Sequence, residues 1–208
     1  MWDSLIQTLT LSCFENNIKN NSTLFWAEYC YFLVEKKAVM LYNNKIILLL
    51  KEIGIMVRVL FICHGNICRS PMAEFILKDM IRRDGLESEI FVESAAATTE
   101  EIGNDMYPPA KRKLKEKGIP FQSRCARIMT KKDYESFDLI VGMDEENRRD
   151  MRRICGRDRD GKISLLMDWA DSSRDVADPW YTGNFEATYQ DLITGCTALL
   201  KKVKERVR

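Results

Sequence analysis

The 208-residue sequence is poor in histidine and has little charge imbalance. The formal net charge is +1, so nothing global predicts nucleic acid as a partner, and an anion site would have to be local. The only histidine is His64. With a single imidazole available, we expect no metal site, and no motif in the sequence indicates another cofactor.

Long apolar runs are also missing. No stretch approaches the ~20 apolar residues that a membrane-spanning helix needs. The most apolar N-terminal stretch, residues 45–51, is short and bracketed by lysines. The first residues lack the basic segment and the small-residue cleavage site of a secretion signal. We therefore expect a soluble protein with no membrane partner.

The seven cysteines are an odd number, and they are spread along the whole chain. This pattern does not suit a disulfide framework. A reducing cytoplasmic location, with a few thiols in special environments, is the better interpretation.

The chain changes character near Met56, which divides it into residues 1–55 and 56–208. The first part is rich in Asn, Lys, Ile and Leu and shows no sustained periodicity. We expect it to be a dispensable N-terminal extension or the translation of an upstream region. The alternative is a genuine extension, helical around Trp26–Val34, that covers apolar residues of the domain or of a partner.

From Val57 onward, short apolar runs alternate with segments of helical periodicity. This alternation predicts an α/β fold with a doubly wound, four-stranded parallel sheet flanked by helices. Ser70 is expected to cap the first helix, with Pro71 at its first position. The expected strands are residues 57–62, 90–95, 138–143 and 163–166, and the expected helices are residues 70–84, 109–117, a segment from about 144, and 184–203.

The segment after the first strand is the strongest candidate for a functional site. Ligands of open α/β sheets bind beyond the carboxyl ends of the strands, where a helix N-terminus offers N–H groups to an anion. Gly65 relaxes the steric limits on the turn, and Arg69 can fold back to grip two phosphate oxygens. A thiol such as Cys63 is reactive in such a setting, where cysteine pKa values fall to roughly 3.5–7.5. Taken alone, Cys63 could equally be a buried core thiol.

Two motifs in this order resemble the low-molecular-weight protein tyrosine phosphatase family. Residues 63–74 (Cys-His-Gly-Asn-Ile-Cys-Arg-Ser-Pro-Met-Ala-Glu) resemble the family's phosphate-binding signature. Residues 177–183 (Ala-Asp-Pro-Trp-Tyr-Thr-Gly) resemble the segment in which the family keeps its general acid. The resemblance extends from about Val57 to the C-terminus.

The resemblance implies a role for each catalytic residue. Cys63 attacks phosphorus and forms a phosphocysteine intermediate, while Arg69 and the loop N–H groups hold the phosphoryl oxygens. Asp178 protonates the leaving phenolate and then activates water. Without the cysteine loop, Asp178 would be interpreted as an Asp-Pro turn residue. The implied partner is a phosphotyrosine-containing protein substrate; the oligomeric state is left open.

The same resemblance implies that Asn66, Ser70 and Ser94 support the loop and the thiolate. The sequence departs from the family pattern at two positions. Ala96 stands where the family usually has glycine, and Arg124 stands where a supporting histidine often precedes the Ala126-Arg127 pair. The histidine link of the support is therefore open in this chain. His64 is expected to face solvent, within the loop, rather than to act as a base.

Three apolar or aromatic residues are expected to form the substrate wall. Ile67, Trp180 and Tyr181 would suit a flat phenyl ring, although isolated aromatic residues are more often part of a core. Cys68 is either a small buried residue or a thiol that protects oxidised Cys63 as a reversible disulfide, and we favour the second role.

Three other functions fit parts of this pattern. Arsenate reductase would need further cysteines on one flexible loop, and Cys125, Cys155 and Cys196 are far apart in sequence. Phosphoarginine hydrolysis would favour a small polar residue in place of Ile67. A phosphotyrosine-binding module without activity would not need both Cys63 and Asp178.

Overall fold

The computed structural model of the chain describes residues 56–207. The predicted N-terminal extension, with its possible helix around Trp26–Val34, lies outside the described residues. No helix in the described part of the chain combines the length and the apolar character needed to cross a membrane.

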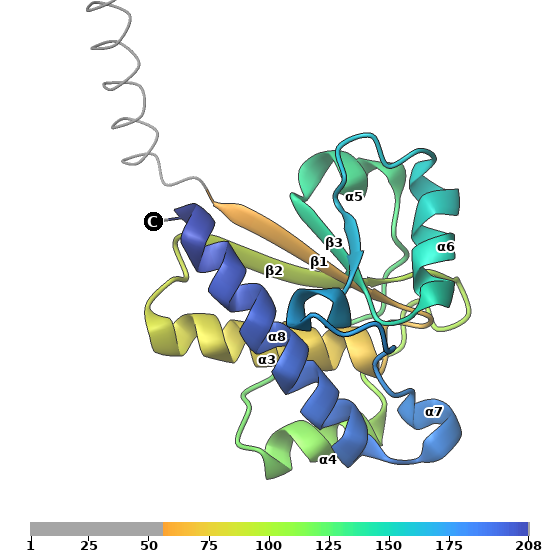
Figure 1. The fold of residues 1–208 in the computed structure, drawn as a ribbon. Coiled ribbons are helices and arrows are strands. Elements are labelled where there is room, and N and C mark those ends of the chain that lie inside the picture. The colour runs from red at the N-terminus through yellow and green to blue at the C-terminus, as the bar shows by residue number, and fades with distance from the viewer. Residues whose placement is uncertain (1–55, 208) are drawn as a thin grey trace, which may run out of the picture. The chain divides into compact units, whose positions relative to one another are not determined.

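A four-stranded parallel sheet forms the centre of the described domain (Figure 1). The strands pair in the order β2-β1-β3-β4. This sheet confirms the predicted fold class, and each strand coincides with a predicted apolar run. The strands are β1 (Val57–Cys63), β2 (Ile90–Ala96), β3 (Leu139–Gly142) and β4 (Ile163–Leu165).

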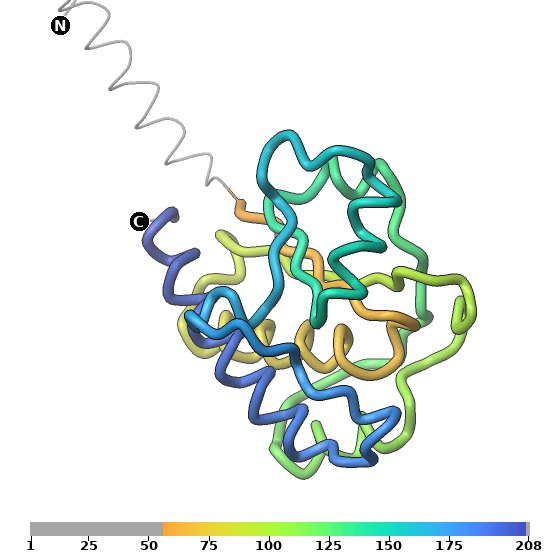
Figure 2. The backbone as a smooth tube through the Cα atoms, turned by 45° about the vertical axis from the view of Figure 1, so that its right-hand side comes forward, coloured from red at the N-terminus to blue at the C-terminus, as the bar shows by residue number. Residues whose placement is uncertain are grey.

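Helices cover both faces of the sheet, as expected of a doubly wound fold (Figures 1 and 2). One face is covered by α3 (Arg69–Asp84), α4 (Pro108–Glu116) and α8 (Phe185–Val207). The other is covered by α5 (Lys131–Ser136) and α6 (Glu145–Cys155). Two short elements follow β4: the 3₁₀ helix η1 (Met167–Ala170) and α7 (Pro179–Thr182).

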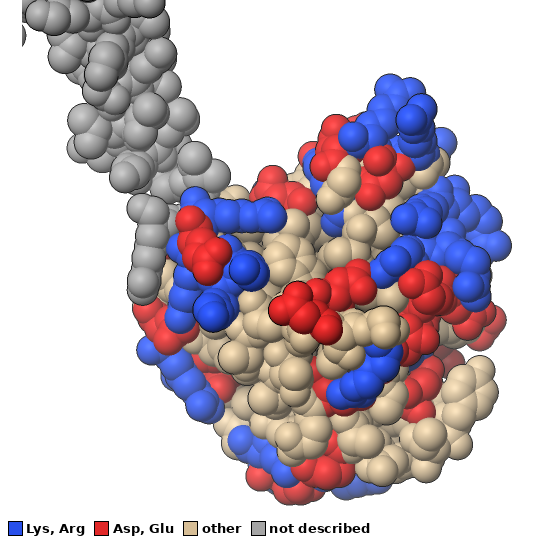
Figure 3. Space-filling model, in the orientation of Figure 1, with Lys and Arg blue, Asp and Glu red and all other residues tan. Residues whose placement is uncertain are grey.

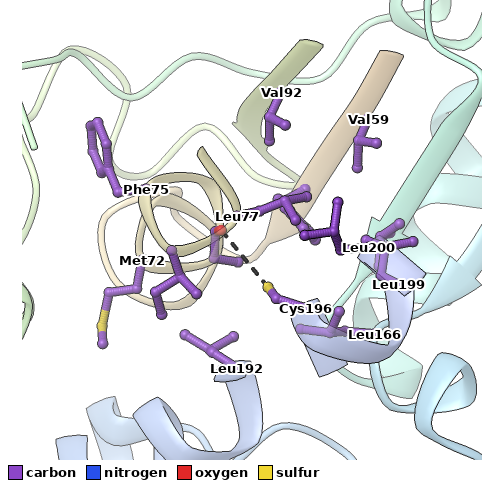
Figure 4. Close-up of a cluster of buried hydrophobic side chains, with 14 of the residues drawn as sticks. Val59, Met72, Phe75, Leu77, Val92, Leu166, Leu192, Cys196, Leu199 and Leu200 are labelled. Atoms are coloured by element: carbon purple, nitrogen blue, oxygen red, sulfur yellow. Dashed lines mark hydrogen bonds between the residues drawn. The ribbon is translucent and has the colours of Figure 1, made fainter. Parts of the chain in front are cut away.

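The alternation of side chains along β1 divides the core into two layers. Val59 and Phe61 point into the larger cluster against α3 and α8. Leu60 and Ile62 point into the smaller cluster against α5 and α6. All four are fully buried, which explains why β1 is a continuous apolar run rather than an alternating one. Figure 4 shows the larger cluster, in which residues of α8 meet residues of α3 and the sheet.

The start of α3 differs from the prediction. The helix begins at Arg69, and the residue in the capping position is Cys68, whose side chain makes no capping hydrogen bond. The expectation that Ser70 caps the helix was therefore wrong. Ser70 lies inside the first turn and is fully buried, and its hydroxyl bonds to the loop before the helix.

The sequence predicted neither α5, η1 nor α7. Each has four to six residues, too few to show a helical period. Acidic and basic side chains are interspersed over the face that Figure 3 shows, in keeping with the near-neutral net charge.

Candidate active site

The loop between β1 and α3 lies at the point where the strand order of the sheet reverses. The chain goes from β1 to its neighbour β2 on one side, and later returns to β3 on the other side. Because the two connections leave β1 on opposite sides, a space remains beyond its carboxyl end, where open α/β folds bind ligands. The segment His64–Cys68 occupies this place, immediately before the N-terminus of α3.

Asn66, rather than Gly65, is the left-handed residue of this loop. The φ angle of Asn66 is 59°, a region that asparagine tolerates better than most residues. Gly65 is needed for a different reason: a Cβ atom there would lie 2.8 Å from Cγ of Glu101. Gly65 thus allows the side chain of Glu101 to approach the loop closely, while Asn66 adopts the left-handed conformation of the turn.

Carbonyl groups at both ends of the loop are bonded to donors outside it. The carbonyl oxygen of Cys63 accepts from the N–H of Ala97 at 2.9 Å, and that of Ile67 accepts from the N–H of Tyr107 at 2.9 Å. Among the residues that the structure describes, no acceptor is bonded to the N–H groups of residues 65–68. A loop whose carbonyls are bonded at both ends and whose N–H groups are available suits an anion.

Cys63 is buried at the end of β1, and its thiol is part of a hydrogen-bonded network. Its Sγ lies 3.0 Å from Oγ of Ser70. The side-chain amide of Asn66 donates to Oγ of Ser70 and to Oγ of Ser94, each at 2.8 Å. Ser94 donates in turn to Oε2 of Glu74 at 2.6 Å. The three residues predicted to support the loop are therefore joined, with Asn66 bonded to both serines.

Arg69 places its guanidinium between two carboxylates. Nη1 lies 2.5 Å from Oδ2 of Asp144, and Nη2 lies 2.5 Å from Oδ2 of Asp178. Burial alone lowers the pKa of Arg69, but the negative charges of Cys63, Asp144 and Asp178 outweigh it and raise the pKa above its usual value. The guanidinium therefore remains charged although only 5% of the side chain is exposed.

Asp178 is held by the turn that it begins. Its Oδ1 accepts from the N–H of Trp180 at 2.9 Å, so it caps α7 while Oδ2 faces Arg69. Two side chains of α8 fix the preceding residue: Asp191 accepts from the N–H of Ala177 at 3.0 Å, and Thr188 donates to its carbonyl at 2.8 Å.

One pocket brings together most of the predicted site residues. Trp180 and Tyr181 at its mouth are 58% and 86% exposed, so both can meet a ligand. Tyr107 packs beside Trp180, with ring centroids 5.4 Å apart. The pocket is lined by Cys63, His64, Gly65, Ile67, Cys68, Arg69, Glu100, Glu101, Glu146, Asp178, Trp180 and Tyr181.

A family model described as low molecular weight phosphotyrosine protein phosphatase matches residues 58–208. The chain belongs to this family. Membership makes it a protein tyrosine phosphatase by class, a hydrolase of phosphoric monoesters.

Relatives support this assignment along the whole matched region. The chain is 41% identical over 152 residues to low molecular weight protein-tyrosine-phosphatase YfkJ of Bacillus subtilis, covering 72% of this chain and 97% of the relative. It is 38% identical to the human low molecular weight phosphotyrosine protein phosphatase over 149 residues, covering 69% and 94%.

Solved structures agree with the fold. The crystal structure of YfkJ superposes with a TM-score of 0.72 and 41% identity, covering 74% of this chain and 99% of that one. The low molecular weight protein tyrosine phosphatase SP-PTP of Streptococcus pyogenes superposes with a TM-score of 0.64 and 36% identity, covering 71% and 93%.

The remaining predicted residues of this phosphatase take different places. Asn66, Ser70 and Ser94 lie behind the pocket, in the buried network, rather than on its surface. His64 is on the pocket rim, where Nε2 lies 3.0 Å from Oε2 of Glu100 and the side chain is 44% exposed. Ala96, the other departure from the family pattern, ends β2 and is fully buried.

Cys68 differs strongly from Cys63 in its surroundings. Burial, with the negative charges of Cys63 and Asp178 added, raises the pKa of the Cys68 thiol to about 12. Cys68 is therefore a neutral thiol at ordinary pH. It packs with Ile67 and Ala126 in a small apolar cluster, of which Ile67 and Cys68 also line the pocket.

Several residues of the site were not predicted from the sequence: Glu100, Glu101 and Glu146 line the pocket, and two others hold its charged and hydrogen-bonded groups. Asp144 was interpreted only as the start of a charged helix, but it both caps α6 and holds Arg69. Its position directly after a buried strand was the available signal. Glu74, in α3, is the buried acceptor at the end of the serine and asparagine network.

Proposed function

We propose that the protein hydrolyses phosphotyrosine in protein substrates through a phosphocysteine intermediate. The observation that carries the proposal is that one pocket is lined by Cys63, Arg69 and Asp178, and that Arg69 and Asp178 form an ion pair. It supports a nucleophile, an anion-binding group and a proton donor acting on one phosphoryl group.

In the first step, the thiolate of Cys63 attacks phosphorus. The loop N–H groups and Arg69 bind the three phosphoryl oxygens, whose charge must be stabilised in the transition state. The bond from phosphorus to the phenolic oxygen breaks, and that oxygen takes its proton from Asp178. The products of this half-reaction are tyrosine and phosphocysteine.

In the second step, water attacks the phosphocysteine. Asp178, now ionised, accepts a proton from the attacking water, and the sulfur leaves as the thiolate. Inorganic phosphate is released, and Cys63 and Asp178 return to their starting states. The hydroxyl of Ser70, 3.0 Å from Sγ, is placed to stabilise the sulfur as it leaves.

The walls of the pocket favour an aryl phosphate. Ile67 presents an apolar side chain inside the pocket, and Trp180 and Tyr181 offer flat aromatic surfaces at its mouth. A phosphoarginine substrate would bring a cationic guanidinium against Ile67, which disfavours it. Because the reaction needs a reduced cysteine, we propose a cytoplasmic location for the enzyme.

Turnover of p-nitrophenyl phosphate and of a phosphotyrosine peptide tests the proposal. Cys63→Ser should abolish both activities while the protein stays folded and binds phosphate, because a serine hydroxyl is not ionised at neutral pH. Cys125→Ser, at an exposed free thiol, is the matched control and should keep full activity. Turnover by Cys63→Ser near the wild-type rate would contradict the assignment, and no turnover by the wild-type protein would indicate a binding module instead.

A further inference from the structure

We propose that Arg124 is a positioning residue that sets the direction of the hydrogen bonds running from Asn66 through Ser70 to Cys63. This inference rests on the proposed role of Cys63 as the nucleophile. Arg124 lies in the segment between α4 and α5, far from the catalytic loop in sequence, and it stands where the family pattern has a supporting histidine.

Arg124 grips the left-handed residue of the loop with both ends of its guanidinium. Nη1 donates to the backbone carbonyl of Asn66 at 3.0 Å, and Nη2 donates to its side-chain Oδ1 at 2.8 Å. Nη2 also lies 3.3 Å from the backbone carbonyl of Ser94. Only 13% of the Arg124 side chain is exposed, so these bonds compete little with water.

These contacts determine which way the amide of Asn66 points. A guanidinium can only donate hydrogen bonds, so the group facing it must be the amide oxygen. The N–H of Arg127 adds a weaker donor, 3.4 Å from the same oxygen. The amide nitrogen of Asn66 must then face Ser70 and Ser94, where it donates both of its hydrogens.

The orientation of the Asn66 amide determines which atom of Ser70 faces the sulfur of Cys63. Because Oγ of Ser70 accepts a hydrogen from Asn66, its own hydroxyl hydrogen is free for Cys63 Sγ. Ser94 likewise accepts a hydrogen bond from Asn66, and its own hydroxyl donates to Glu74. Every bond in the network is thus oriented so that a donor, and not a lone pair, meets the thiolate.

The charges around Arg124 keep this orientation fixed. Glu74 lies 3.8 Å from Nη2 of Arg124, and Lys78 donates to the other oxygen of Glu74 at 2.5 Å. A guanidinium carries only N–H donors and cannot become an acceptor. A histidine can change between donor and acceptor roles near neutral pH, so an arginine makes the support independent of pH.

The test compares Arg124→Met, Arg124→Lys and the control Arg152→Met, which removes the same charge from an exposed position on α6. The first readout is the pH dependence of Cys63 alkylation by iodoacetamide, located by mass spectrometry. This readout needs no phosphatase activity, so it distinguishes failure of this inference from failure of the proposed function. The second readout is kcat and KM for phosphotyrosine.

Arg124→Met should raise the midpoint of the alkylation profile by about one pH unit and lower kcat about tenfold, the worth of one charge-assisted hydrogen bond, with KM little changed. Arg124→Lys, which still donates, should lose less than Arg124→Met in both readouts. Arg152→Met should match the wild type. An unchanged alkylation profile and kcat in Arg124→Met, even with a lower melting temperature, would overturn the proposal.

A double-mutant cycle keeps the test decisive if Arg124→Met does not fold. Ser70→Ala removes the last bond of the network, so Arg124→Lys should have little further effect on kcat in that background. Additive effects of Ser70→Ala and Arg124→Lys would show that Arg124 does not act through Ser70.

Discussion

The Oδ2 atom of Asp178 lies 2.5 Å from Nη2 of Arg69, so the proposed acid is bonded to the proposed phosphate-binding group. Oδ1 of the same carboxylate is occupied by the N–H of Trp180. A phosphoryl group bound by Arg69 would therefore have the proposed acid beside it, next to Trp180.

This relationship predicts a dependence on the leaving group. Asp178→Asn keeps a cap for α7 but cannot give a proton. It should reduce turnover of phosphotyrosine by ~10²–10⁴-fold and turnover of p-nitrophenyl phosphate by much less, because the nitrophenolate is stable without a proton. The measurement is kcat for a series of aryl phosphates. Asp175→Asn, an exposed acid of the same segment, is the control. An equal loss across the series would exclude Asp178 as the proton donor.

Asp144 is expected to orient Arg69. Asp144→Asn preserves the cap of α6 while it removes the charge that faces Nη1 of Arg69. We expect kcat/KM for phosphotyrosine to fall about tenfold, because each 1.4 kcal/mol of lost transition-state stabilisation is a factor of ten. Steady-state kinetics with Glu145→Gln as control would check this, since Glu145 is next along the helix and pairs with Arg148 instead. Equal kinetics for the two variants would show that Asp144 has no such role.

Oxidation by peroxide should be reversible because of Cys68. Peroxide converts Cys63 to a sulfenic acid, and attack by Cys68 then forms a disulfide and releases water. Since the pKa of Cys68 is about 12, its thiolate fraction grows with pH, and disulfide formation should accelerate from about pH 7 to 9. Activity recovered with dithiothreitol, and the linked peptide seen by mass spectrometry, are the readouts.

The matched variants for this experiment are Cys68→Ser and Cys125→Ser. Cys68→Ser should convert the inactivation to an irreversible one, with sulfinic or sulfonic acid on Cys63. Cys125→Ser should behave as the wild type. Reversible inactivation that persists in Cys68→Ser would mean that Cys68 is not needed to protect Cys63.

Acid should weaken the contact between α4 and α8. Glu186 accepts hydrogen bonds from Gln190 and from the ammonium groups of Lys113 and Lys117, and these lower its pKa to about 2. In the unfolded chain a glutamate titrates near ~4.3. The contribution of Glu186 to stability is therefore complete above that pH and is lost as the pH falls toward 2.

Thermal unfolding between about pH 5 and 2 would measure this effect. Glu186→Gln should flatten the fall of the melting temperature, and added salt should reduce the difference because the carboxylate is at the surface. Glu205→Gln, an exposed acid on the same helix, is the control. A slope equal to that of the wild type would assign the acid sensitivity to other carboxylates.

A protein that begins at Met56 should fold and act as the full chain does. The sheet begins at Val57, and the family match begins at residue 58. We expect an unchanged melting temperature and an unchanged kcat/KM toward phosphotyrosine. A large drop in melting temperature, or aggregation, would mean that residues 1–55 stabilise the domain.

The strands and long helices could be predicted because their patterns are local. The apolar run of β1 and the helical spacing along α8 are visible in consecutive residues, and the catalytic loop is a contiguous motif. The partners of that loop are not local. The family pattern drew attention to Arg124, and the end of a strand to Asp144, but neither signal shows what these residues contact, because their partners, like those of Asp191, are far away in sequence.

The roles of two residues in and beside the loop, Gly65 and Ser70, could also be assigned only from the structure. Gly65 was interpreted as the residue that eases the turn, but Asn66 has the positive φ angle and Gly65 makes room for Glu101. Ser70 was interpreted as a helix cap, whereas it reaches back to Cys63. In both cases the residue type was compatible with either role, and only the neighbours in space distinguish them.

The segment of Asp178 is held by Thr188 and Asp191, which belong to α8 and bond to Ala177. Proteins are synthesised from the N-terminus, so the loop of Cys63 leaves the ribosome long before those two anchors do. A nascent chain can thus complete β1 and α3 while the segment of the proposed acid, Asp178, still lacks its anchors. Full activity on phosphotyrosine should accordingly appear only after α8 has been synthesised and has docked.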